Sequence, residues 1–134
     1  MIGNNEYDEP WLDESFASFA AALYDGDLES LHVPAPRPDY YHLSSPVSTF
    51  TDHADEGGIN YYYYTIYDYG ASTINDLRKK LGDETFYKSM QIYFQLKKFD
   101  VTTTKDFIDI MEVVSGEDLD AFFQQHRVYE QDQQ

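Results

Sequence analysis

One acidic side chain in this sequence is placed where it could do chemistry. Glu14 lies in the run E-P-W-L-D-E-S-F-A at residues 9–17, near the start of a predicted helix. On that helix it falls nearly opposite the apolar stripe, and its neighbours one and two turns on, Ser18 and Ala21, are small. A second helix can approach such a surface closely, and a carboxylate enclosed in that seam needs a cation or hydrogen bonds. A metal ion would meet this need, whereas an ordinary exposed acid near a helix N-terminus is the alternative interpretation.

Helical periodicity supplies the elements that would position Glu14. Apolar residues recur at three- and four-residue spacing through most of the chain, which predicts five helices and no confident strand. Four of them are expected at residues 10–24, 59–81, 84–97 and 117–129, and another lies between a capping box at 103–106 and Gly116. The expected inward residues, helix by helix, are Leu12, Phe16, Phe19, Ala20 and Leu23; Ile59, Tyr63, Ile66, Gly70, Ile74, Leu77 and Leu81; Phe86, Met90, Tyr93 and Phe94; Phe107, Ile110, Met111 and Val114; and Leu119, Phe122, Phe123 and His126.

Residues 25–58 separate the first two helices and show no helical pattern. Prolines at positions 34, 36, 38 and 46 interrupt any helix, and two glycines close the stretch. A loop of this length is uncommon in a compact domain and often functional, although a segment that merely wraps the surface explains it equally well. The sequence therefore predicts an all-α fold, a compact bundle of about five helices with one long irregular loop at residues 25–58.

Size and charge restrict the classes of protein that fit. The chain has 134 residues, 42% of them hydrophobic, which suffices for one modest core. Its formal net charge of −16 argues against nucleic acid as a partner, because phosphate binding needs clustered Lys and Arg. No apolar run is long enough for a membrane span. The absence of cysteine excludes a disulfide scaffold and a cysteine-based zinc site.

The run around Glu14 resembles a motif of a known enzyme family. Residues 11–17, W-L-D-E-S-F-A, are similar to the segment W-L-[ND]-E-[GS]-F-A of aminopeptidase N-type zinc metallopeptidases, the gluzincins. The resemblance implies that Glu14 is the third zinc ligand, after the two histidines of an H-E-x-x-H motif. The four histidines of this sequence form no such pair. We therefore expect the sequence to begin between the ligands and to lack the N-terminal part of the same catalytic domain, which would be its partner.

A second match implies a catalytic residue. Residues 66–72, I-Y-D-Y-G-A-S, resemble the family's Y-x-K-G-A, whose tyrosine hydrogen-bonds the oxyanion formed when water attacks the peptide carbonyl. The resemblance thus assigns this catalytic role to Tyr67. Tyr69 stands where the family usually has lysine, which is a departure from the pattern. The alternative is that Tyr67 is one more core tyrosine beside Ile66 and Gly70.

Further similarities extend along most of residues 6–123. Residues 77–86 resemble the family's L-G-D-E-x-F connection between helices, residues 102–107 its T-T-x-D-F, and residues 115–123 its S-G-x-D-L-x-x-F-F. The resemblance implies that residues 1–134 form a single helical domain, the C-terminal subdomain of a thermolysin-like zinc peptidase catalytic domain. Residues 25–58 match poorly, so the substrate pocket is the least predictable part.

These observations favour an enzyme and leave one alternative of another class. The resemblance implies a zinc-dependent aminopeptidase that removes N-terminal residues from peptides by zinc-activated water, with these 134 residues inactive alone because the H-E-x-x-H helix is missing. The alternative is a non-catalytic acidic helical interaction module that uses the tyrosines at 61–64 as an aromatic patch. If the missing part of the domain normally covers the seam beside Glu14, self-association through the uncovered apolar surface is expected.

Overall fold

Residues 9–99 and 103–128 are described by the structure, a computed structural model; residues 1–8, 100–102 and 129–134 lie outside the described part. All regular elements of the described residues are helical and none is a strand, which confirms the predicted all-α class. The elements are α1 (Trp11–Tyr24), η1 (Leu28–Ser30), α2 (Val47–Thr51), η2 (Ala54–Glu56), α3 (Gly58–Tyr62), η3 (Tyr63–Tyr69), α4 (Gly70–Leu81), α5 (Asp83–Lys97), α6 (Thr104–Ser115) and α7 (Asp120–Gln125). None of these helices is both long and apolar enough to cross a membrane.

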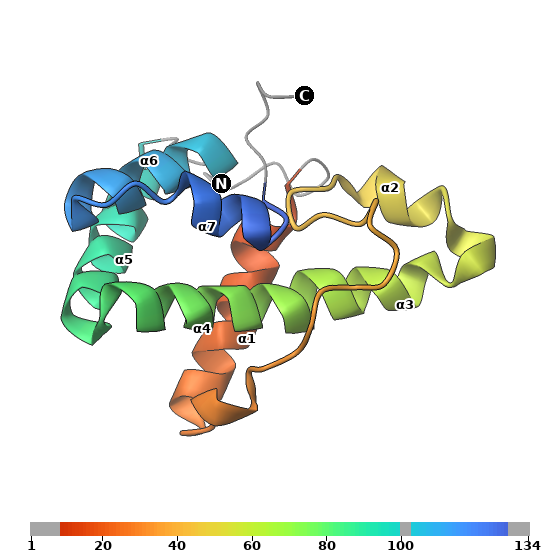
Figure 1. Ribbon diagram of the computed structural model, residues 1–134, viewed down its shortest axis with the longest axis horizontal. Coiled ribbons are helices and arrows are strands. Elements are labelled where there is room, and N and C mark those ends of the chain that lie inside the picture. The colour runs from red at the N-terminus through yellow and green to blue at the C-terminus, as the bar shows by residue number, and fades with distance from the viewer. Residues whose placement is uncertain (1–8, 100–102, 129–134) are drawn as a thin grey trace.

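One long helical rod is crossed by α1. The elements α3, η3 and α4 follow one another without a break, and α1 packs against both η3 and α4 (Figure 1). At the other end of α4 the chain turns at Gly82, whose φ of 83° is a conformation that glycine adopts without strain. There α5 begins, and it packs against α6. Figure 1 shows α6 and α7 above the rod, on the same side as the beginning of α1.

An aromatic cluster joins α1 to the three C-terminal helices. Its members are Trp11, Phe16, Tyr93, Phe107 and Phe123, each 8% exposed or less. Phe107 is central, with its ring centroid 5.3 Å from that of Phe16 and 5.1 Å from that of Tyr93. Both contacts are tilted strongly towards the edge-to-face arrangement that ring quadrupoles favour. The cluster therefore fixes where α1 lies relative to α5, α6 and α7.

The N-terminus of α6 anchors the beginning of α1. Trp11 Nε1 donates a hydrogen bond of 3.0 Å to Thr104 Oγ1, and the Thr104 N–H donates to the Glu9 carboxylate at 2.8 Å. The first N–H groups of a helix have no partner inside the helix, so Glu9 satisfies one of them and faces the positive end of α6. The predicted capping box between Thr103 and Asp106 is confirmed. Thr102, the first residue of that matched segment, lies outside the described residues.

The apolar stripe of α1 is buried only in its first half. Phe16 and Phe19 are buried as predicted, whereas Leu23 is 41% exposed and Ala20 is also exposed. The prediction that Phe94 faces inward is wrong as well, because this residue is 46% exposed. These residues lie on a side of α1 and α5 that the described elements leave open. Periodicity identifies an apolar side of a helix but does not say whether a neighbour covers it.

A π-helical segment shifts the register of the long rod. The single stripe predicted from Ile59 to Leu81 is confirmed from Ile66 onwards, but Ile59 and Tyr63 are 52% and 56% exposed and were wrongly assigned inward. The element η3 is wound as a π-helix, whose wider turn accommodates an additional residue relative to an α-helix. Upstream of it the inward position moves by one residue, and Gly58 is buried where Ile59 was expected.

Residues 25–58 are less irregular than the sequence predicted. They contain three short helical pieces, η1, α2 and η2, which are too short to produce a periodic signal. Between them the chain runs along the rod, where the Val33 N–H bonds to Ser72 Oγ at 3.2 Å. The long loop predicted at residues 25–58 therefore contains short helical turns, and Leu28 and Val33 attach part of it to α4.

Arg127 holds this segment in place. Its Nη1 donates to the carbonyl oxygens of Pro38 and Tyr41 at 2.9 and 3.1 Å, and its own carbonyl accepts from the Leu43 N–H at 2.8 Å. Arg127 has a φ of 60°, which is uncommon for a residue with a Cβ atom and incompatible with continuing a helix. The helix predicted over 117–129 is accordingly shorter, since α7 ends before this turn; Tyr129 lies outside the described residues.

Candidate active site

The structure brings together the two residues that the sequence singled out. Glu14 lies in the first turn of α1 and Tyr67 lies within η3. The Tyr67 hydroxyl donates a hydrogen bond to Oε2 of the Glu14 carboxylate, although 53 positions separate the residues in sequence. Both side chains are half-buried. A carboxylate with a phenol donor beside it, partly shielded from water, is an arrangement that can hold a cation and supply a proton donor at one place.

Gly70 allows α1 and the rod to come this close. A Cβ atom built on Gly70 would lie 1.9 Å from Ser15 Oγ and 2.7 Å from Ser15 Cβ, so no other residue fits against Ser15 without movement. The sequence predicted a close approach beside Glu14 but placed it at Ser18 and Ala21. Ala21 is exposed and Ser18 is half-buried, so the seam lies one residue from Glu14 instead.

Ser15 is the residue of this seam that sequence reasoning missed. It is fully buried, and its hydroxyl donates a hydrogen bond of 2.6 Å to the Ile66 carbonyl oxygen. The acceptor is a main-chain carbonyl oxygen, which every residue type has, so the sequence alone does not indicate this bond. The available signal was the pair of small residues, Ser15 beside Glu14 and Gly70 near Tyr67.

Aromatic rings surround the Tyr67 phenol on the rod. The centroids of Tyr63 and Tyr62 lie 5.4 and 6.1 Å from that of Tyr67. The exposed aromatic patch expected at residues 61–64 is only partly present, because Tyr61 packs on Tyr41 with centroids 4.9 Å apart. Of the four tyrosines at residues 61–64, Tyr63 alone is exposed, and the other three are half-buried.

Tyr69, which replaces the lysine of the related motif, points into the protein. It is 6% exposed, and burial raises the pKa of its phenol, while the Arg127 guanidinium acts in the opposite direction. The side chain is therefore neutral near pH 7 and contributes no positive charge beside Tyr67. The positive charge that acts on Tyr69 is that of Arg127.

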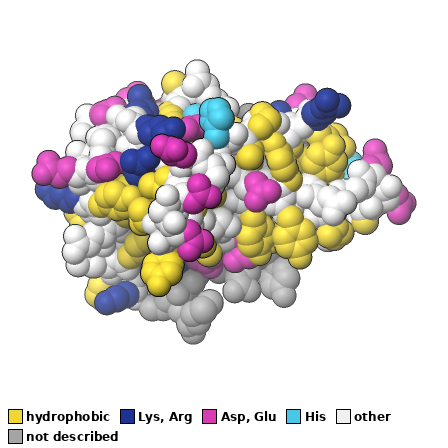
Figure 2. Space-filling model, turned by 90° about the horizontal axis from the view of Figure 1, so that it is seen from below, with side chains coloured by type: hydrophobic (Ala, Val, Ile, Leu, Met, Phe, Trp, Pro, Cys, Tyr) yellow, Lys and Arg dark blue, Asp and Glu magenta, His cyan; other side chains and the backbone are white. Residues whose placement is uncertain are grey.

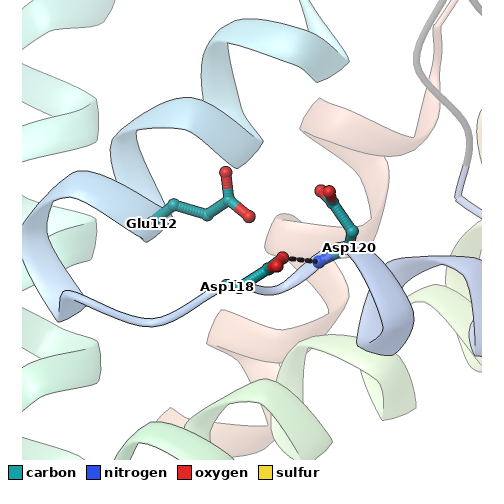
Figure 3. Close-up of side chains that lie close together, drawn as sticks. All are labelled: Glu112, Asp118 and Asp120. Carbon is teal, nitrogen blue, oxygen red and sulfur yellow. Dashed lines mark hydrogen bonds between the residues drawn. The ribbon is translucent and has the colours of Figure 1, made fainter.

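A group of three acids was not predicted from the sequence. Glu112 from α6, Asp118 from the following turn and Asp120 from the first turn of α7 point towards one another (Figure 3). Among the described residues this is the single group of three or more His, Asp or Glu side chains close enough to hold a metal ion, and Glu14 is not part of it. Glu112 accepts from the Leu119 N–H at 2.8 Å and Asp118 from the Asp120 N–H at 3.0 Å, so these acids cap the start of α7.

The histidines of the described part make other contacts. His126 pairs with Asp76, with 3.1 Å between Nε2 and Oδ2, and its ring stacks on Phe122 with centroids 4.1 Å apart. His53 lies 3.3 Å from the Glu56 carboxylate. No histidine in the described ranges joins Glu14 in a possible metal-binding group.

Two apolar cavities open on the surface away from this pair. One of about 430 Å³ lies between residues 34–37 and the rod, lined also by Asn60, Tyr61 and Tyr64. The other, of about 210 Å³, lies between α1 and α5. Neither is lined by Glu14 or Tyr67. Figure 2 shows hydrophobic side chains interspersed with acids on the face seen from below, one group on the α5 side and a row on the α3 side.

Comparison with known proteins gives consistent matches. The model of the peptidase family M1 domain matches residues 1–126. Aminopeptidase N of Escherichia coli (strain K12) is 40% identical over 63 residues, which cover 47% of this chain and 7% of that protein. The enzymes of that name from Streptomyces lividans and Lactococcus lactis subsp. lactis are 29% identical over 126 residues and 27% identical over 128 residues, covering 84% and 87% of this chain. No solved structure matches the chain.

The matches include the part of the chain that carries the candidate site. The chain spans 7% of the length of the Escherichia coli relative and 15% of the length of the other two. The family match nevertheless covers nearly all of the sequence, including Glu14 and Tyr67. The chain therefore belongs to peptidase family M1 and resembles its aminopeptidase N-type members.

Proposed function

We propose that Glu14 and Tyr67 are two residues of the catalytic centre of a zinc-dependent aminopeptidase. The observation that carries this proposal is the hydrogen bond from the Tyr67 phenol to the Glu14 carboxylate, across the seam between α1 and η3. Two motifs that are far apart in sequence thus converge on one point. The alternative interpretations, an exposed acid at Glu14 and a core tyrosine at Tyr67, do not predict this contact.

The residues present fit zinc as part of a ligand set. A carboxylate is a usual zinc ligand, and ligating carboxylates commonly accept a hydrogen bond from a neighbouring group. Glu14 has such a donor in Tyr67. The other two ligands are those of the H-E-x-x-H motif, which the sequence does not contain. Zinc held there would supply a Lewis acid that activates water and polarises the peptide carbonyl.

Each residue of the pair has a separate role in this proposal. Glu14 holds the metal and Tyr67 donates its O–H to the oxyanion that develops on the substrate carbonyl. A donor aimed at that oxygen lowers the barrier by roughly 3–4 kcal/mol. In the resting state the same O–H is directed at Glu14, so the phenol changes acceptor during the reaction. The substrate is the N-terminal residue of a peptide, a specificity that rests on the family relationship.

The test is the substitution Glu14→Gln in a protein that contains this segment together with an H-E-x-x-H segment. Glutamine keeps the size of the side chain but removes its charge. We expect bound zinc and the hydrolysis of an aminoacyl-p-nitroanilide both to be lost, because three protein ligands are needed to hold a catalytic zinc. Glu29→Gln, an exposed acid in η1, is the matched control. Full activity in Glu14→Gln would refute the ligand assignment.

We also propose that the 134 residues alone do not hold zinc tightly. One carboxylate and a phenol are too few ligands, so calorimetry should detect no binding tighter than roughly micromolar. Tight stoichiometric binding that survives Glu14→Gln but is abolished by Glu112→Gln would move the metal to the acidic group at α7. Tight binding that depends on Glu14 would mean that other ligands have been overlooked.

The second candidate is a non-catalytic interaction module. The observation in its favour is the open apolar side of α1 and α5, where Leu23 and Phe94 are 41% and 46% exposed. Exposed apolar surface of this kind marks binding sites but equally marks surface that another part of a larger protein covers. Glu14→Gln separates the candidates, since an interaction module has no use for that carboxylate.

A further inference from the structure

Ser15 and Ile66 form a second contact directly beside the candidate catalytic pair. The consecutive residues Glu14 and Ser15 in α1 face the consecutive residues Ile66 and Tyr67 in η3. The Ser15 hydroxyl donates to the Ile66 carbonyl at 2.6 Å, and the Tyr67 hydroxyl donates to Glu14. The two hydrogen bonds run in opposite directions across one seam, so the position of either pair constrains the other.

The π-helical winding of η3 explains why the Ile66 carbonyl takes this bond. In an α-helix the Gly70 N–H would donate to the carbonyl four residues earlier, which is that of Ile66. Here the Gly70 N–H is directed to the carbonyl oxygens of Thr65 and Tyr67 instead. The Ser15 hydroxyl donates to the oxygen that the α-helical pattern would have given to Gly70. The side chain of one helix thereby completes the hydrogen bonding of the other.

Packing restricts Ser15 to this position. Ser15 is 0% exposed, and its side chain fills the space that a Cβ atom on Gly70 would need. Leu43 Cδ2 lies 3.4 Å from the same position and closes the seam on another side. The hydroxyl therefore has little freedom to choose a different acceptor.

We propose that Ser15 is a positioning residue: its hydroxyl, seated against Gly70 and bonded to the Ile66 carbonyl, fixes the π-helical register of η3 that brings Tyr67 against Glu14. Without the hydroxyl, the Ile66 carbonyl would be buried with one hydrogen bond fewer, which is unfavourable. Winding the turn as an α-helix restores a donor from Gly70 and redirects the Tyr67 side chain away from α1. The consequence for catalysis rests on the proposed function, whereas the register itself does not.

The test compares Ser15→Ala with Ser18→Ala in the 134-residue chain by nuclear magnetic resonance. Ser18 is one turn further along α1 and half-buried, so it undergoes the same chemical change outside the seam. The first readout is the nuclear Overhauser contact between the Tyr67 ring protons and the Glu14 side chain. The second is the hydrogen-exchange rate of the Gly70 amide, which reports local opening of the turn.

We expect Ser15→Ala to lose the Tyr67–Glu14 contact while the Gly70 amide stays protected, because it then bonds to the Ile66 carbonyl. Ser18→Ala should match the unsubstituted chain in both readouts. A retained Tyr67–Glu14 contact in a folded Ser15→Ala would overturn the proposal. If Ser15→Ala does not fold, the same measurements are made on Ser15→Cys, whose thiol is a weaker donor. A weakened contact then supports the proposal, and an unchanged one refutes it.

A kinetic measurement separates this proposal from the proposed function. In a protein with an H-E-x-x-H segment, Ser15→Ala should lower kcat and leave KM and zinc content unchanged, because Glu14 stays in α1 while Tyr67 turns away. Loss of the Tyr67–Glu14 contact together with full activity of Glu14→Gln would leave the register proposal standing and remove the catalytic one.

Discussion

The Tyr67 phenol donates its hydrogen bond to the carboxylate of Glu14, a residue 53 positions away on a different helix. Half-burial of both side chains keeps the contact partly dry and still accessible from one side. The hydrogen bond therefore links η3 to α1 at the point where the two helices meet.

Removing the Tyr67 hydroxyl should separate metal binding from catalysis. In a protein with the complete ligand set, Tyr67→Phe is expected to lower kcat by about 10²–10³-fold, because the oxyanion loses its donor. Zinc content should stay unchanged, since Glu14 is untouched. Steady-state kinetics and metal analysis check this, with Tyr24→Phe as the control at a residue that is 91% exposed. Loss of zinc in Tyr67→Phe would instead assign the phenol the role of holding Glu14.

The capping box at the start of α6 makes a measurable contribution to stability. Thr103 accepts from the Asp106 N–H at 3.0 Å, and Asp106 accepts in return from the Thr103 N–H. Thr103→Ala should lower the free energy of unfolding by about 1 kcal/mol, whereas Thr103→Ser retains a capping oxygen and should cost much less. Urea unfolding measures both. Equal stabilities for the two variants would show that the cap is not what stabilises this end of α6.

The acidic group at α7 should make stability depend on pH. Desolvation raises the pKa of Glu112, the Leu119 N–H lowers it, and Asp120, Asp118 and Asp109 raise it further, with a net upward shift. The folded state therefore retains the proton at a pH where the unfolded state has lost it. The contribution of Glu112 to stability is thus full below its unfolded pKa and falls as pH rises through the folded value.

Glu112→Gln should remove this dependence, because the amide oxygen still accepts from Leu119 and carries no charge. Urea unfolding at pH 4 and pH 7 should show the stability of Glu112→Gln improving relative to the unsubstituted chain as pH rises. Glu29→Gln, at an exposed site, controls for the change in net charge. A relative stability that moves the opposite way with pH would contradict the raised pKa.

The open apolar side of α1 and α5 should cause self-association. Two copies would cover Leu23 and Phe94, and their association should increase with salt, which screens repulsion between chains of net charge −16. Light scattering at several concentrations measures this. Phe94→Lys should weaken association, whereas Val113→Lys, at a residue 81% exposed on α6, should not. A chain that stays monomeric at every concentration and salt would refute the expectation.

The elements that were predicted well are those whose period is continuous. Residues of α4 from Ile74 to Leu81 keep one stripe, and Phe107 and Met111 in α6 keep another, because one side of each helix is buried along its length. The capping box at Thr103 was also readable, since both partners lie within four positions. Helical periodicity and capping motifs were readable because they depend on residues that are close together in the sequence.

The parts that were not predicted depend on atoms far apart in sequence or on the main chain. The π-helical turn moves a hydrogen bond by one residue among four tyrosines, and no pattern of side chains records that shift. Ser15 is bonded to a carbonyl 51 positions away. Glu14 and Tyr67 were identified through the family resemblance, and the structure adds their contact; their catalytic roles stay predictions.

Arg127 places a constraint on the order in which the chain takes shape during synthesis. The stretch from Pro38 to Leu43 leaves the ribosome long before the residue whose guanidinium and carbonyl tie it down. The nascent chain can pair α1 with the rod before this stretch is bonded to Arg127. The three hydrogen bonds between the stretch and Arg127 form only after α7 has emerged. A ribosome stalled before this codon would therefore carry a chain that lacks them.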